Sequence, residues 1–381
     1  MKHPYLREEH EIFRQSFRKF LEKEAYPYYE QWEEDRIIPR SFWTKMGEQG
    51  FLCPDLPEEY GGSEVDWGFN VVINEELEKV GSGLVGIGLH SDVNIPYIMA
   101  FGTDEQKERW LPKCVSGECI TAIAMTEPGA GSDLANISTT AVLNGDHYIV
   151  NGQKTFITNG IHSDLVIVAC KTNPKAVPKH KGISLLVIER DHPGFSRGRK
   201  LDKIGLHCQD TAELIFEDCK VPKENLLGEE GHGFLYMMQK LQQERLIVAI
   251  AAQVASEEML STTLDYVKSR QAFGKSIGQF QNTQFKLAEM ATDIEMGRVF
   301  LDSLIADHIA GKDVVTKVSM AKWKYTELAK KIAGECLQLH GGYGYMEEYK
   351  IARRYRDIPV ASIYAGTNEI MKTIIAKNLG L

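Results

Sequence analysis

The chain has 381 residues, of which 43% are hydrophobic and 25% charged, and its formal net charge at pH 7 is −9. This length exceeds what one hydrophobic core usually supports, so two or three closely packed domains are expected. The acidic balance argues against general nucleic-acid binding, and the longest uninterrupted apolar run, residues 246–252, is too short to span a bilayer.

The seven cysteines and eleven histidines form no recognisable metal-binding pattern. Neither C-x-x-C nor H-E-x-x-H occurs, so we expect reduced thiols and no metal site. Residues 1–9 are charged and lack both the apolar stretch of a signal peptide and the Arg-rich, acid-poor pattern of a transit peptide. These features predict a cytoplasmic protein of bacterial type, with a processed organelle form as the alternative.

The first third of the chain, residues 1–120, predicts an N-terminal α-helical domain. Its first helix has apolar residues at helical spacing, and further helices are expected over residues 67–80 and 104–111. The apolar residues of the first helix are Ile12, Phe13, Phe17 and Phe20. Proline and glycine turn signals separate these segments.

Residues 121–231 change to short strands and predict an antiparallel β-barrel or sandwich. Asn144-Gly145 and Asn151-Gly152 each lie between apolar or alternating runs. Because Asn-Gly suits the two positive-φ positions of a type I′ turn, we expect two hairpins and a meander. Further strands are expected over residues 121–125, 165–170, 183–188 and 212–216.

Helical periodicity returns in residues 232–381 and predicts a C-terminal four-helix bundle, which makes the whole chain an α+β protein. The expected helices cover residues 233–270, 282–310, 314–339 and 367–378. No internal repeat interrupts them.

The most distinctive segment is residues 125–133, with the sequence MTEPGAGSD. Pro128 removes a backbone donor, and Gly129 and Gly131 permit positive φ and the close approach of a ligand. Small residues around free N–H groups favour an anionic or carbonyl-bearing ligand. The alternative, for the glycines taken alone, is an ordinary turn.

Glu244 is the candidate general base on the longest expected helix. It is the only charged member of a stripe at helical spacing, and burial there would raise its pKa toward neutrality. The other members are Met237, Leu241, Val248, Ala251 and Ala255. Periodicity alone leaves a structural pair with Lys240 equally open.

Together with F-I-T at 156–158, R-Q-A-F-G at 270–274, Q-L-H-G-G at 338–342 and Y-A-G-T at 364–367, these motifs resemble the acyl-CoA dehydrogenase family over essentially the whole chain. The resemblance implies that FAD removes a β hydride from an acyl-CoA, giving a trans-2-enoyl-CoA, and that electrons pass to an electron-transfer flavoprotein. It also implies a homotetramer built as a dimer of dimers. The chain has no strand-linked G-x-G-x-x-G, so FAD would bind without a Rossmann domain.

The family pattern assigns residues to the cofactor and the substrate. The FAD residues implied are Ala124, Met125, Thr126, Gly131, Ser132, Phe156, Ile157, Thr158, Arg270, Phe273, Gln281, Gln338, Leu339, Gly341, Gly342, Thr367, Asn368 and Glu369. The substrate residues implied are Ser132, Leu241, Arg245, Tyr364 and Gly366. In the family, the R-x-x-F-G and Q-x-x-G-G segments reach the cofactor of an adjacent subunit.

The chain departs from the family at its most common base position, where Ala365 replaces a glutamate. The long-chain and isovaleryl-CoA dehydrogenase branches pair Ala or Gly at that position with a base on the earlier helix, and this resemblance favours Glu244. The backbone N–H of Ala365 would still donate to the thioester oxygen. Glu369 is a weaker candidate for the base, whereas Glu127 belongs to the turn and is expected to be structural.

Two other functions fit the same scaffold. An acyl-CoA oxidase would transfer electrons to O₂, although the chain lacks an oxidase-like C-terminal extension. A non-catalytic acyl-CoA-binding protein would carry no flavin.

Overall fold

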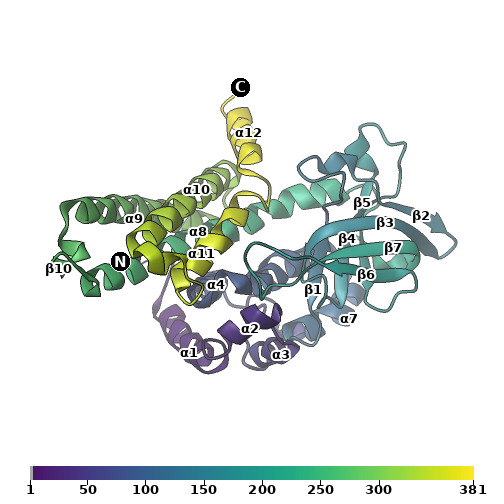
Figure 1. The fold of residues 1–381 in the computed structure, drawn as a ribbon. Helices are drawn as coiled ribbons and strands as arrows, with labels where there is room; N and C mark the ends of the chain where they lie inside the picture. The colour runs from purple at the N-terminus through teal and green to yellow at the C-terminus, as the bar shows by residue number, and fades with distance from the viewer. Residues whose placement is uncertain (1–2) are drawn as a thin grey trace.

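The computed structural model describes residues 3–381, in which helices, then strands, then helices follow one another along the chain. The N-terminal helices and the C-terminal helices lie together, and the sheet stands to one side of them (Figure 1). The expected three-part α+β architecture is therefore confirmed.

The N-terminal part contains seven α-helices. They are α1 (Glu8–Glu24), α2 (Tyr29–Asp35), α3 (Arg40–Glu48), α4 (Gly68–Val80), α5 (Val85–Gly88), α6 (Ile95–Phe101) and α7 (Asp104–Val115). Thr103 and Gln106 form a capping box that starts α7, which explains why the helix begins there. The apolar stripe of α1 is narrower than expected, because Phe17 is fully buried whereas Ile12 is 62% exposed.

The middle part is one eight-stranded sheet in the order β6-β7-β3-β2-β4-β5-β8, with β1 paired to β4. Its strands are β1 (Thr121–Ala124), β2 (Thr140–Asn144), β3 (His147–Thr158), β4 (Leu165–Lys171), β5 (Ile183–Glu189), β6 (Phe195–Lys200), β7 (Thr211–Pro222) and β8 (Leu226–Leu227). The sheet is mainly antiparallel, as expected, but β1 and β2 both run parallel to β4.

The two Asn-Gly pairs have different structures. Gly145 has φ of 68° and lies in the tight connection between β2 and β3, so a hairpin is confirmed there. The second expected hairpin is wrong, because Asn151 and Gly152 lie inside β3 at a shift of register against β7. A Cβ on Gly152 would lie 2.4 Å from Oγ1 of Thr139, so glycine is needed there for close contact and not for a turn.

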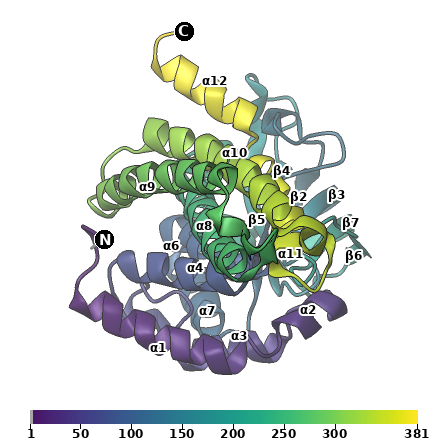
Figure 2. The ribbon, with the colours of Figure 1, turned by 60° about the vertical axis from the view of Figure 1, so that its left-hand side comes forward.

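The C-terminal part is a bundle in which α8 and α10 pack closely, with α9 beside them (Figure 2). Its helices are α8 (Gly233–Ser269), α9 (Gln281–Ile309), α10 (Val315–His340), α11 (Lys350–Asp357) and α12 (Asn368–Asn378). α8 runs from the sheet into the bundle, and α12 projects from the body (Figure 1). No helix within residues 3–381 is apolar over enough length to cross a lipid bilayer.

Candidate active site

Glu244 lies in the first third of α8, and its side chain is half-buried. One of its oxygens, Oε2, is buried and accepts no hydrogen bond from the described residues. Burial raises the pKa of Glu244 to about 7, and the positive charges of Arg245 and Lys322 limit the rise. Such a carboxyl group exchanges a proton near neutral pH and has a free oxygen with which to do so.

The loop before α12 meets α8 beside Glu244. Val248 packs with Ala361 and Ala365, and Nε of Arg245 donates to the carbonyl oxygen of Ala365 at 3.4 Å across 120 residues of sequence. Ala365 has φ of 55° and Gly366 has φ of 86°, so two successive residues are left-handed. This backbone is uncommon for alanine and marks a turn held in place by its surroundings.

Lys322 on α10 completes this cluster. Its side chain is fully buried, and Nζ donates to the carbonyl oxygen of Gly366 at 2.7 Å and to Oδ1 of Asn368 at 3.2 Å. Sequence analysis overlooked it, although the signal that selected Glu244 was present. Lys322 is the only charge on a helical stripe otherwise made of Val318, Tyr325 and Ala329.

The competing assignments for Glu244 and for the base find no support in this geometry. Nζ of Lys240 lies over the ring of Phe101, 5.7 Å from its centroid, and forms no ion pair with Glu244 within residues 3–381. Glu127 is buried and paired with Lys154 at 2.8 Å. Burial opposes the shift, but the positive charge of Lys154 and the hydrogen bonds that Glu127 accepts lower its pKa to about 2. Glu369 is exposed.

Segment 125–133 is hydrogen-bonded to β3, whereas its two glycines have free space around them. Nζ of Lys154, a fully buried side chain on β3, donates to the carbonyl oxygen of Met125 at 3.0 Å and to Glu127. The Thr155 N–H donates to the carbonyl oxygen of Thr126. A Cβ built on Gly129 or Gly131 would meet nothing within 4 Å. Ser132 is exposed as well, so this edge is free to receive a ligand.

At the end of β3, Phe156 stands out from the sheet. It has φ of 61° and is 68% exposed, whereas its neighbour Ile157 is buried and Thr158 is half-buried. An exposed ring on left-handed backbone is costly for an aromatic residue, typically by about 1–3 kcal/mol for the backbone alone. The arrangement fits a planar ligand that stacks on the ring.

The other end of α8 carries the second group of expected cofactor residues. Arg270 and the end of α10 share an open hollow of about 590 Å³. The expected residues that line it are Arg270, Gln338, Leu339, Gly341 and Gly342. Phe273, with φ of 53°, is 96% exposed, and Gln281 is exposed too. At about 1.5 Å of rise per residue, the axial distance from Glu244 to the helix end at Ser269 is about 38 Å.

Comparison with known proteins decides the family. Models of the N-terminal, middle and C-terminal domains of acyl-CoA dehydrogenases match residues 7–118, 122–219 and 231–380. The chain belongs to the acyl-CoA dehydrogenase family.

Three relatives illustrate the similarity. The mitochondrial long-chain specific acyl-CoA dehydrogenase of Rattus norvegicus is 48% identical over 371 residues, which cover 97% of this chain and 86% of that protein. The mitochondrial isovaleryl-CoA dehydrogenase of Pongo abelii is 37% identical and covers 98% of this chain and 89% of its own. The crystal structure of an acyl-CoA dehydrogenase from Geobacillus kaustophilus covers both chains completely at 71% identity with a TM-score of 0.99.

Most of the remaining expected residues of this acyl-CoA dehydrogenase lie on or beside α8 and α12. Leu241 is buried one turn before Glu244, and Tyr364 is half-buried beside Val248. Oγ1 of Thr367 accepts the Ile370 N–H and caps α12. The amide of Asn368 is bonded to Trp323, Thr326 and Glu327, all on α10. Asn368 thus anchors α12, and Ala124 is fully buried in β1.

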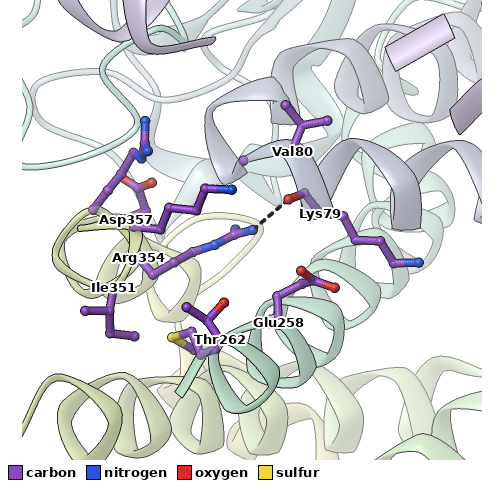
Figure 3. A pocket seen from close by; sticks show the side chains of 11 residues that line it. Lys79, Val80, Glu258, Thr262, Ile351, Arg354 and Asp357 are labelled. Carbon is purple, nitrogen blue, oxygen red and sulfur yellow. Dashed lines mark hydrogen bonds between the residues drawn. The ribbon is translucent and has the colours of Figure 1, made fainter. Parts of the chain in front are cut away.

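A second hollow of this acyl-CoA dehydrogenase, of about 50 Å³, lies between α4, α8 and α11 (Figure 3). Arg354 reaches across it to the carbonyl oxygen of Lys79 and pairs with Glu78. Asp357 and Glu258 also line it. These contacts fasten α11 to α4, and the small volume suits water better than a substrate.

Proposed function

We propose that this enzyme is an FAD-dependent dehydrogenase of long-chain acyl-CoA in fatty acid β-oxidation, with electron-transfer flavoprotein as its electron acceptor. The observation that carries the reaction is the buried, unpartnered oxygen of Glu244 beside the left-handed turn at Ala365. A long acyl chain is favoured over a short branched one because the identity to the long-chain relative is higher, 48% against 37% for the isovaleryl relative.

Glu244 acts as the general base for the α proton of the acyl thioester. A pKa of about 7 leaves much of it ionised at neutral pH while keeping it basic enough to take a proton. The N–H of Ala365 donates to the thioester oxygen, where negative charge develops as the proton leaves. Arg245 and Lys322 add positive charge on the same side. Leu241, Tyr364 and Gly366 surround the reacting part of the acyl group.

The residues around segment 125–133 and the end of β3 fit FAD. Phe156 presents a ring for stacking, and Thr158 offers a hydroxyl beside it. The open backbone at Gly129 and Gly131 has room for a bulky anionic group. FAD, when bound, supplies the acceptor for the β hydride. Ala124, Met125, Thr126, Ser132 and Ile157 complete this side of the cofactor site.

The residues at the far end of α8 serve the cofactor of a neighbouring subunit. Arg270 cannot reach the chemistry at Glu244 in its own chain across about 38 Å of helix. We therefore assign Arg270, Phe273 and Gln281, with the hollow formed by residues 338–342, to a subunit contact within a dimer of dimers. We assign Thr367 and Glu369, at the start of α12, to the cofactor site of their own chain, near Glu244.

The test is an assay of the purified protein with butyryl-, isovaleryl- and palmitoyl-CoA. We expect anaerobic bleaching of a bound flavin, highest kcat/KM for palmitoyl-CoA, and fast turnover with electron-transfer flavoprotein but slow reoxidation by O₂. Rapid peroxide formation would identify an oxidase, and a colourless protein that binds acyl-CoA without turnover would overturn the enzymatic proposal. Highest kcat/KM for isovaleryl-CoA would overturn the long-chain assignment alone.

A further inference from the structure

Lys322 has an environment that is unusual for a lysine. Its side chain is fully buried, yet within residues 3–381 it forms no ion pair. Its two hydrogen bonds go to neutral oxygens, the carbonyl of Gly366 and the amide of Asn368. Lysines are almost never buried completely without a paired charge, because removing the ammonium group from water is costly. Such a cost points to a role that a neutral residue would not fill.

The first contact of Lys322 restrains the turn at Ala365. Lys322 holds the carbonyl of Gly366 at 2.7 Å, and Arg245 bonds the preceding carbonyl, that of Ala365. Because each peptide group is planar, these contacts restrain two successive peptide planes. The Ala365 N–H lies on the preceding peptide plane, so only the φ and ψ of Ala365 separate it from the restrained planes, and this φ lies in the narrow left-handed region.

The second effect of Lys322 is electrostatic. Four ionisable groups from different elements face Glu244: Tyr97 on α6, Arg245 on α8, Lys322 on α10 and Tyr364 before α12. Only Arg245 and Lys322 carry positive charge, and both oppose the burial that raises the pKa of Glu244. Burial and the charge of Arg245 lower the pKa of Lys322 to about 8, so it remains mostly charged at neutral pH.

We propose that Lys322 is a positioning residue of the active site, which orients the turn that carries the Ala365 N–H through the Gly366 carbonyl and places a buried positive charge beside Glu244. This inference rests on the proposed roles of Glu244 and Ala365. The opposing explanation is that Lys322 only anchors α12 through Asn368.

Two substitutions separate the two effects. Lys322→Met removes both the hydrogen bond and the charge, whereas Lys322→Gln removes the charge but keeps an N–H donor for Gly366. For Lys322→Met we expect kcat to fall about 100-fold, as misplacement by about 1 Å can cause. In both variants the acid limb of the kcat/KM profile should move up by about one pH unit, because an opposite charge beside Glu244 is lost. Lys322→Gln should regain most of kcat above that limb.

The controls distinguish positioning from anchoring. Asn368→Ala removes the other partner of Lys322, and Lys330→Met removes a lysine of α10 that pairs with Glu327 on the surface. Thermal midpoint and flavin content are measured for every variant. If Lys322→Met and Asn368→Ala lower the thermal midpoint alike while the pH profile of Lys322→Met stays as in the wild type, the inference is overturned.

The same series separates this inference from the proposed function. Near-normal turnover of Glu244→Gln would overturn the base assignment and the Lys322 role with it. Loss of turnover in Glu244→Gln with an unmoved pH profile in Lys322→Gln would overturn the Lys322 role alone. Lys322→Gln serves as the decisive variant if Lys322→Met does not fold, because its amide still satisfies the Gly366 carbonyl.

Discussion

The two halves of α8 differ in what surrounds them. Around Glu244 the helix is enclosed by α10 and the turn at Ala365, and the partners of this region lie in the same chain. At Arg270 the helix ends in an open hollow, and Phe273 just beyond it is 96% exposed. This contrast supports our proposal that one chain supplies the acid–base chemistry, whereas a neighbouring subunit completes the far end.

Two exposed phenylalanines, one on β3 and one just after α8, share the same unusual features. Phe156 and Phe273 both have positive φ and both expose most of their rings, although they lie in different domains. Backbone strain together with an exposed aromatic ring marks a ligand or partner contact more strongly than either feature alone. We infer that they mark two contributions to cofactor sites, Phe156 to the site of its own chain and Phe273 to that of a neighbour.

The largest expected effect comes from breaking the enclosed half. Glu244→Gln should lower kcat by about 10³-fold, within the range that a general base contributes, while flavin content stays unchanged. In the wild type kcat/KM should rise with pH through about 7, because Glu244 must lose its proton to act. Steady-state assays and flavin absorbance measure both quantities.

Two controls accompany this variant. Lys240→Met should leave turnover near that of the wild type, since Lys240 faces Phe101. Glu369→Gln should reduce flavin retention more than turnover per bound flavin. Normal activity of Glu244→Gln, or equal loss in Glu369→Gln with full flavin content, would contradict the assignment of the base.

The second effect is on stability, because an enclosed carboxyl group is costly to ionise. The pKa of Glu244 is raised from 4.5 to about 7, so between these values the folded chain keeps a proton that the unfolded chain has released. The free energy of unfolding therefore falls as pH rises through this window. As the pH rises from 4 to 8, the free energy of unfolding of Glu244→Gln should increase by up to about 3 kcal/mol relative to that of the wild type.

The measurement is a comparison of urea unfolding for the two proteins at several pH values. Asp92 and Asp357 also have pKa values raised to about 7 by burial, and they impose the same trend on both proteins. The difference between the proteins isolates Glu244. A difference that does not change with pH would show that this carboxyl group is already solvated.

The sequence predicts the long helices well, because local periodicity determines them. α8, expected over residues 233–270, covers Gly233–Ser269. The sequence does not predict the elements whose position depends on contacts with residues far away in the chain. α11 has few apolar residues, and its Arg353 and Arg354 pair with Glu30 and Glu78 from the N-terminal helices. Such ion pairs cannot be predicted from local sequence, because their partners lie far apart in the chain.

The candidate site follows the same rule. Glu244 was recognisable because a charge interrupts an apolar stripe, and Lys322 carries the same signal on α10. The contact of both helices with the turn at Ala365 has no local signature. Gly152 failed as a hairpin signal for this reason too, since Thr139, which requires it, lies on another segment.

A third, smaller effect concerns the open end. Arg270→Gln should weaken FAD binding by about 10- to 100-fold, the value of a hydrogen bond to a charged group. It should leave the thermal midpoint of the flavin-free protein unchanged, because the Arg270 side chain is exposed and, within residues 3–381, stacks over Tyr343 without an ion pair. Flavin titration measures the FAD affinity, and thermal unfolding measures the midpoint. Lys268→Gln, an exposed neighbour on α8, is the matched control, and weakening as large as that of Arg270→Gln would indicate a general charge effect.

The smallest effect, a factor of two, tests the comparison most directly. If each site takes Glu244 from one chain and Arg270 from its neighbour, a dimer of Glu244→Gln with Arg270→Gln contains one site with both substitutions and one with neither. Such a mixed dimer, isolated by two affinity tags, should have about half of the wild-type activity per dimer at low FAD, although both parent proteins are nearly inactive there. Were both residues to serve the site of their own chain, every site of the mixed dimer would carry one substitution and no activity would return. The two halves of α8 would then belong to one site, contrary to the length of helix between them.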